Sequence, residues 1–163
     1  MTGPGWPDDY AARKAGHDCA LCASLGAGDN DQTIAVTDLD HTEVRLDRRS
    51  RLPGYCIVVW RRGHVAEPTE LADDDASAYW REVGAVARAI EAEFAPVKLN
   101  FFTLGNMVPH LHTHVVPRFL DDPVPGGLIP WDDMFGPEPV DDTTLRRRAD
   151  AIRERLLGRS RLS

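Results

Sequence analysis

The stretch from Pro109 to Arg118 constrains the fold more than any other part of the chain, because histidines occupy three alternate positions in it. These are His110, His112 and His114. Side chains alternate between the two faces of a β-strand, so the pattern predicts a strand that carries all three imidazoles on one face. Alternate residues of a strand are about 6.6 Å apart, which places the outer imidazoles about 13 Å from each other. One metal ion cannot bind all three, so the array requires an extended ligand, or a metal at one end and a different ligand at the other.

The side chains between the histidines help to decide among the interpretations of this strand. Leu111, Thr113 and Val115 form the opposite face. A mostly apolar face favours a packed strand over an exposed edge strand with chance histidines, which is one alternative. A His-x-His metal site in a sheet is a second alternative. We prefer a phosphate chain as the ligand, because imidazoles can donate hydrogen bonds to phosphoryl oxygens or attack phosphorus.

The alternating stretch resembles the signature of the histidine-triad (HIT) superfamily of nucleotide hydrolases and transferases. Thr113 stands at one position where the signature has an apolar residue. The upstream run from Lys98 to Asn106 is similar to the strand and glycine turn that precede the signature, and the likeness extends over residues 19–118. The resemblance implies an α+β, HIT-like fold, in which an antiparallel sheet of about five strands is packed by one long helix, here with a C-terminal helix added.

The chain length of 163 residues fits one domain with a sizeable core. We expect a flexible N-terminal arm over residues 1–16, because this segment is rich in glycine and proline. The HIT-like catalytic domain is expected over residues 17–120. Residues 121–163 are expected to form a loop and an arginine-rich helix that packs on the same domain.

Hydrophobic periodicity predicts the elements of this domain. Apolar side chains at three- and four-residue spacing predict a helix over residues 67–94, with its main part from residue 73. A second helix is expected over residues 141–157, with its arginines on solvated faces or, as the alternative, at a phosphate or a partner. Strands are predicted over residues 33–37, 43–46, 55–60 and 97–104.

Charge and composition exclude several classes of partner. The formal net charge is −7, which argues against a general nucleic-acid binder, because such a protein has a basic surface. No apolar run approaches the roughly 18 residues of a membrane span, and the first residues lack the apolar core of a signal peptide. We therefore expect a cytoplasmic protein with no membrane or nucleic-acid partner.

Cys19 and Cys22 form a Cys-x-x-Cys pair. This spacing suits two thiolates on one zinc ion or a redox pair, and two ordinary buried thiols are a third interpretation. A redox pair normally follows a strand in a thioredoxin-like unit, and no strand-like run precedes Cys19, so we favour zinc. The chain has 3 cysteines, an odd number that does not make a disulfide framework.

The resemblance implies roles for individual residues around the predicted strand. His112 occupies the position of the family's nucleophile, which attacks the α-phosphorus and forms a nucleotidyl-histidine intermediate. His114 is placed to meet the departing group or a phosphoryl oxygen. Asn106 falls where relatives often carry glutamine, beside the phosphates. Met107 falls where many relatives carry serine, and methionine cannot donate a hydrogen bond.

The resemblance also assigns a second task to the first histidine of the signature, which otherwise counts among the catalytic three. In zinc-carrying relatives, two thiolates, an upstream histidine and this first histidine bind one zinc ion. Four such ligands make a closed, structural site with no open position for a substrate. His17 and His41 are substitute ligands. The set implied here is Cys19, Cys22, His64 and His110.

The function implied by the resemblance is hydrolysis of a purine nucleotide or dinucleotide, of the nucleoside phosphoramidate or dinucleoside polyphosphate type. A homodimer is expected because most relatives are homodimers. One alternative is a zinc-stabilised nucleotide-binding module with little turnover, which Met107 keeps open. Another is a nucleotidyltransferase, although some of those carry glutamine at the position of His114.

Overall fold

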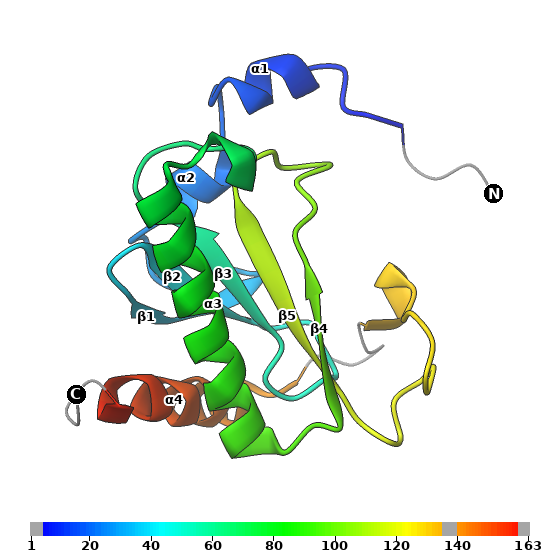
Figure 1. Ribbon diagram of the computed structural model, residues 1–163. Helices are drawn as coiled ribbons and strands as arrows, with labels where there is room; N and C mark the ends of the chain where they lie inside the picture. The colour runs from blue at the N-terminus through cyan, green and yellow to red at the C-terminus, as the bar shows by residue number, and fades with distance from the viewer. Residues whose placement is uncertain (1–4, 135–139, 160–163) are drawn as a thin grey trace.

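An antiparallel five-stranded sheet forms the centre of the molecule, and helix α3 crosses one of its faces (Figure 1). The computed structural model describes residues 5–134 and 140–159. The strand order is β1-β2-β3-β5-β4 with antiparallel pairing throughout, which confirms the predicted α+β fold. The strands are β1 Thr33–Asp38, β2 Thr42–Asp47, β3 Cys56–Trp60, β4 Lys98–Phe102 and β5 His112–Arg118.

Helix α3 spans Asp73–Phe94, which matches the main part of the predicted helix. Residues 68–70 instead form a separate 3₁₀ turn, because Leu71 and Ala72 have extended backbone angles that interrupt the helix. Three aspartates in the first turn of α3 stabilise its N-terminus through the helix dipole. No helix in the described residues is long and apolar enough to cross a membrane. The other helices are α1 Tyr10–Lys14, α2 Ala20–Ser24, η1 Pro68–Glu70, η2 Trp131–Met134 and α4 Asp142–Arg159.

Helix α4 packs against α3 and β1 through a buried apolar stripe. Its arginines bond to the elements beside it. Arg153 donates from Nε to the carbonyl of Val36 in β1 at 2.5 Å, and Arg155 pairs with Glu93 of α3 at 3.2 Å. These contacts use arginine side chains to fix α4 against the domain.

Alternation along β5 gives the two faces of the sheet different roles. Thr113 and Val115 face α3, and the Thr113 hydroxyl lies 2.7 Å from the Tyr79 hydroxyl and 2.8 Å from that of Thr103. The Thr113 hydroxyl thus has hydrogen-bond partners inside the core, although the signature has an apolar residue at this position. His114, on the opposite face, contacts Tyr55, which belongs to a second and smaller buried cluster.

The predicted strand over residues 109–118 is too long at its start, because β5 begins at His112. The His110 N–H bonds to the Val108 carbonyl at 2.8 Å, two residues back, so the backbone makes a tight turn there. The His110 ring contacts the carbonyl of Trp60. His110 therefore lies in the turn before β5, while His112 and His114 lie on the strand itself.

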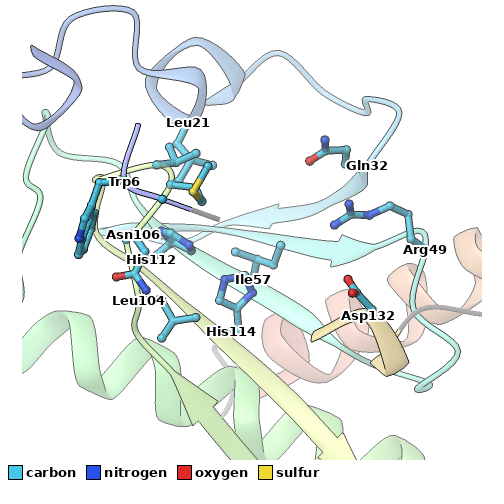
Figure 2. A pocket seen from close by; sticks show the side chains of 14 residues that line it. Trp6, Leu21, Gln32, Arg49, Ile57, Leu104, Asn106, His112, His114 and Asp132 are labelled. Carbon is cyan, nitrogen blue, oxygen red and sulfur yellow. The ribbon is translucent and has the colours of Figure 1, made fainter. Parts of the chain in front are cut away.

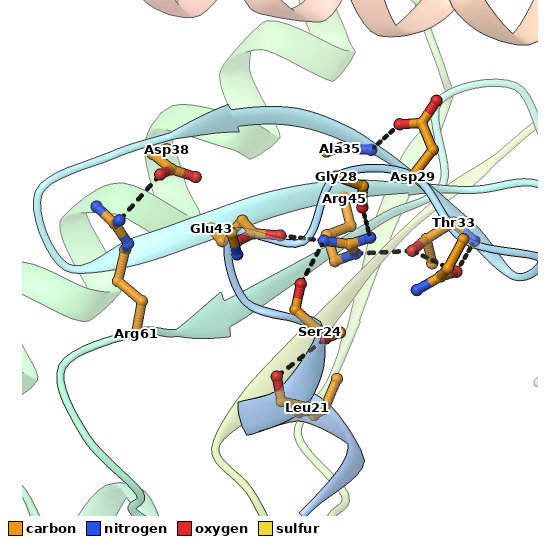
Figure 3. Close-up of polar contacts among 12 residues, drawn as sticks. Leu21, Ser24, Gly28, Asp29, Thr33, Ala35, Asp38, Glu43, Arg45 and Arg61 are labelled. Atoms are coloured by element: carbon orange, nitrogen blue, oxygen red, sulfur yellow. Dashed lines mark hydrogen bonds and ion pairs between the residues drawn. The ribbon is translucent and has the colours of Figure 1, made fainter.

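A buried ion pair on β2 fixes the loop that follows α2 (Figure 3). Glu43 and Arg45 contact each other, and both side chains are 2% exposed. Glu43 accepts from the Gly26 N–H at 2.7 Å, while Arg45 donates to the Gly28 carbonyl at 2.6 Å and to the Thr33 hydroxyl at 2.7 Å. Since α2 carries Cys22, the pair also anchors the Cys-x-x-Cys segment to the sheet.

We expect Arg45→Met to lower the free energy of unfolding by about 3–5 kcal/mol, because it leaves the Glu43 carboxylate buried without its partner. Urea unfolding measures the loss. The double variant Glu43→Leu, Arg45→Met should recover part of it, since no unpaired charge is then buried. The exposed pair of Arg61 with Asp38, at 2.9 Å, gives the control: Arg61→Met should cost less than about 1 kcal/mol. Equal losses at Arg45 and Arg61 would contradict the prediction.

Candidate active site and metal centre

A cavity of about 860 Å³ opens on the face of the sheet opposite α3 (Figure 2). His112 and His114 of β5 line its middle, with Ile57 of the neighbouring strand β3. The register places Ile57 directly opposite His114. The cavity therefore lies over the two histidines that alternation directs away from the helices.

His112 is oriented by its own backbone neighbourhood. Its Nδ1 lies 2.6 Å from the carbonyl oxygen of His110, and the residue is 9% exposed. A carbonyl can only accept a hydrogen bond, so Nδ1 carries the proton and Nε2 keeps its lone pair. Burial lowers the pKa of His112, while the bond to the carbonyl acts in the opposite direction. The ring is thus held neutral, with the lone pair of Nε2 available for a chemical step.

His114 is oriented by Tyr55, whose hydroxyl lies 2.8 Å from Nδ1 of the imidazole. Burial raises the pKa of Tyr55 well above its usual value, so the phenol keeps its proton. Burial, followed by the nearby His112 and Arg49, lowers the pKa of His114 to about 3. When the Tyr55 hydroxyl donates to Nδ1, the neutral ring carries its proton on Nε2. It can donate a hydrogen bond from Nε2 to a phosphoryl oxygen.

The turn after β4 lines the cavity beside His112. Asn106 lies in this turn, and Gly105 before it has a φ of +75°, a conformation that favours glycine. Helix α1 holds the turn from outside: Tyr10 donates to the Gly105 carbonyl at 3.4 Å and Arg13 to the Met107 carbonyl at 3.3 Å. The described part of the predicted N-terminal arm, residues 5–16, thus contacts the site.

A second cluster of chemically active side chains lies next to the turn that precedes β5. Its four possible metal-ligand atoms, from two cysteines and two histidines, all lie within 4.8 Å of one another. His110 Nδ1 is 3.4 Å from the Cys19 sulfur and 3.3 Å from that of Cys22, and His64 Nδ1 is 3.5 Å from Cys22. Ligand atoms around a tetrahedral zinc ion are about 3.6 Å apart, given bonds of about 2.3 Å to sulfur and 2.1 Å to nitrogen. The spacing fits such an ion.

The protonation of the two histidines in this cluster also suits a metal. His110 Nε2 lies 2.7 Å from the Trp60 carbonyl and His64 Nε2 lies 3.1 Å from the Lys14 carbonyl. Each Nε2 therefore carries the proton, which leaves the lone pair of each Nδ1 directed at the sulfurs. Burial, followed by the neighbouring Cys19, raises the pKa of the Cys22 thiol to about 11. A cation bound between the sulfurs would stabilise the thiolate and so offset the effect of burial on this pKa.

The structure brings the sequence-predicted residues together in two groups. Asn106, His112 and His114 line the cavity. The four implied zinc ligands form the second group. The substitutes His17 and His41 are absent from the metal-ligand group found in the described part of the chain, and His41 bonds instead to Glu82 at 3.1 Å.

Sequence reasoning missed several residues that line or support the cavity. Tyr55 precedes β3 and lies two residues before Ile57, which pairs with His114. Strand alternation would therefore have placed Tyr55 on the same face of the sheet as His114. Arg49, Asp132 and Trp6 come from distant segments, with no local pattern that joins them. Arg49 pairs with the buried Asp47 at 3.1 Å.

The fold and the site together define an α+β domain in which two histidines of one strand serve a cavity and a third turns to a metal-ligand cluster. The chain belongs to the HIT family: the HIT domain model matches residues 29–121. Protein hit of Bacillus subtilis (strain 168) is 31% identical over 106 residues, which are 62% of this chain and 71% of that protein. Bis(5'-adenosyl)-triphosphatase of Saccharomyces cerevisiae is 25% identical over 84 residues, 48% of this chain and 41% of the yeast protein.

Solved structures share the fold. A histidine triad (HIT) protein from Sinorhizobium meliloti 1021 superposes with a TM-score of 0.71 at 28% identity, over 85% of this chain and 97% of that one. A Zn-bound histidine triad family protein from Mycobacterium smegmatis superposes with a TM-score of 0.64 at 18% identity, over 90% and 98% of the two chains. The matched HIT domain begins after both cysteines of the metal-ligand cluster.

The two histidines of the cavity should occupy opposite tautomers at neutral pH. We expect His112 to carry its proton on Nδ1 and His114 on Nε2, because a carbonyl can only accept from the first ring and the Tyr55 hydroxyl can donate to the second. Their lowered pKa values mean that each ring gains its second proton only below the ordinary value of 6.5, and His114 near pH 3. Long-range ¹H–¹⁵N NMR spectra between pH 8 and 4 measure both properties. A protonated His114 at pH 6, or Nε2–H on His112, would contradict this assignment.

Proposed function

We propose that the protein is a nucleotide hydrolase in which His112 forms a covalent nucleotidyl intermediate. The observation that carries the proposal is the 2.6 Å contact between His112 Nδ1 and the His110 carbonyl. It keeps the lone pair of Nε2 available for attack on phosphorus. Membership of the HIT family and the similarity to the yeast bis(5'-adenosyl)-triphosphatase support a nucleotide as the substrate.

The first step forms a bond between His112 Nε2 and the α-phosphorus and breaks the bond from that phosphorus to the leaving group. The imidazole becomes positively charged, and the His110 carbonyl stabilises this charge through the Nδ1–H bond. His114 and Asn106 donate hydrogen bonds to phosphoryl oxygens where negative charge develops. In the second step, water attacks the phosphorus, the phosphorus–nitrogen bond breaks, a nucleoside monophosphate leaves, and the water proton passes to solvent.

The site favours a leaving group that departs as a stable anion. His114 is neutral at pH 7 because its pKa is lowered to about 3, so it has no readily lost proton to give. Met107, which lines the cavity, cannot supply a proton either. A nucleoside phosphate needs no proton to leave, whereas an amine does. We therefore propose a purine dinucleoside polyphosphate as a better substrate than a phosphoramidate.

His112→Ala should reduce the hydrolysis of diadenosine triphosphate by about 10³-fold or more, because it removes the nitrogen that forms the proposed intermediate. Chromatographic separation of AMP and ADP gives the rate, and calorimetry tests whether nucleotide binding persists. His17→Ala is the matched control, since His17 is exposed and lies outside both groups of site residues.

Near wild-type hydrolysis by His112→Ala, or a nucleotidyl adduct trapped on another residue, would refute the assignment. A wild-type protein that binds diadenosine triphosphate and never hydrolyses it would favour the alternative, a zinc-stabilised binding module. Transfer of the nucleotidyl group to an acceptor other than water would favour a transferase.

We also propose that Cys19, Cys22, His64 and His110 bind one structural zinc ion. The distances and the orientation of both imidazoles fit such an ion, and the Zn-bound M. smegmatis protein of the same fold supports it. Bound zinc would join α2, the segment after β3 and the turn before β5 through these four side chains. Four protein ligands leave no position for a substrate.

Elemental analysis of protein purified without added metal should find one zinc ion per chain. Cys22→Ser should lose zinc, and a chelator should lower the Tm of the wild type, because binding energy at a structural site is also folding energy. Cys56→Ala is the control: Cys56 is buried in β3 outside the cluster, so this variant should keep its zinc. A metal-free folded protein, or a disulfide between Cys19 and Cys22, would show that the pair has another role.

The homodimer and the cytoplasmic location stay predictions. The first rests on the family resemblance, and the second rests on the composition of the sequence.

A further inference from the structure

The cavity has two chemically different ends, with the histidines between them (Figure 2). Gln32, Arg49 and Asp132 gather at one end and offer both hydrogen-bond donors and acceptors. Trp6 stands at the other end, beside Asn106. A volume of about 860 Å³ lies toward the upper end of the range for ligand pockets. The cavity can therefore hold groups on both sides of a phosphate bound at the histidines.

Trp6 is a cavity residue that lies outside the matched HIT domain. It precedes the matched HIT domain, which starts at residue 29. Its ring packs against Tyr10 with centroids 4.8 Å apart and planes at 64°, and Tyr10 in turn bonds to the Gly105 carbonyl. Trp6 is nevertheless 66% exposed, which is far more than a tryptophan that serves only packing. The contact with Tyr10 thus positions the indole while most of its surface stays exposed.

We propose that Trp6 is a ligand-binding residue that stacks against a nucleobase of the substrate. The inference rests on the proposed function, because the histidines and Asn106 define where the phosphate lies. A group that is joined to such a phosphate and carries a flat ring is a nucleoside. A planar indole matches it, since every base has a π-face and stacking needs no particular hydrogen-bond pattern.

The surroundings of Trp6 support a stacking role. Leu104 and Met107 line the same cavity and are 49% and 50% exposed, so apolar surface continues from the indole toward the histidines. A flat ring can bind at this apolar end without any particular hydrogen-bond pattern. At the polar end, donors and acceptors can form hydrogen bonds with a second group of the ligand. Met107 stands where many relatives carry serine, and it adds to this apolar surface.

Calorimetric titration in the catalytically silent His112→Asn background tests the inference with two probes. Diadenosine triphosphate contains bases, and inorganic triphosphate contains none. Trp6→Ala should weaken binding of diadenosine triphosphate by about tenfold or more, since base–aromatic stacking is typically of that strength. Trp6→Phe should restore most of the affinity. Binding of inorganic triphosphate should change less than twofold in either variant.

Trp80→Ala is the matched control, because Trp80 is 45% exposed on α3 and lies outside the cavity lining. Fluorescence gives an independent reading: diadenosine triphosphate should quench the tryptophan emission of the parent protein and quench Trp6→Phe much less. Unchanged affinity for diadenosine triphosphate in Trp6→Ala would overturn the inference and leave the proposed hydrolase intact. Equal losses for both probes would also overturn it, since Trp6 would then only support the turn at Gly105. A parent protein that binds neither probe would overturn the inference together with the proposed function.

Discussion

One hydrogen bond, from His112 Nδ1–H to the carbonyl of His110, sets the tautomer of the imidazole at the middle of the cavity. Without it the imidazole could carry its proton on either nitrogen, and only one of the two tautomers presents a lone pair to the cavity. The bond joins residues two apart in the chain, so a small change in backbone angle at His110 would break it. The rest of the structure can be understood as a set of contacts that fix this backbone.

His110 is fixed on three sides. Its own N–H closes a tight turn with Val108, and its ring nitrogens contact the Trp60 carbonyl on one edge and the two sulfurs of the cysteine pair on the other. The ring is fully buried. The side chain of His110 therefore belongs to the metal-ligand cluster, while its carbonyl contacts His112 in the cavity. A metal bound there would act on catalysis only through the position of one carbonyl oxygen.

Local periodicity predicted most of the fold, because alternation along a strand and helical spacing are properties of neighbouring residues. It placed His112 and His114 on one face and Thr113 on the other, as the structure shows. It did not predict the turn at His110, since the segment there is held by contacts of Leu111 with Val65 and of His110 with Trp60, which are distant in sequence. The spacing of Cys19 and Cys22 marked a metal site, but only the family resemblance pointed to His64, because nothing local links a loop histidine to that pair.

The cavity is built from two kinds of structure: strands of the sheet, and segments that no local sequence pattern links to those strands. The histidines lie on β5, inside the matched domain and inside the sheet, where register leaves them little freedom. Trp6 and Leu21 come from residues before that domain. Leu21 lies between the two cysteines, and the Lys14 carbonyl bonds to His64, so the metal-ligand cluster holds both ends of the segment that joins α1 to α2. The same cluster thus contacts the histidine whose carbonyl orients His112 and the segment that forms one wall of the cavity. Because Cys19 and Cys22 also lie before the matched domain, changes in residues 5–28 can alter both the wall of the cavity and, through His110, the orientation of His112.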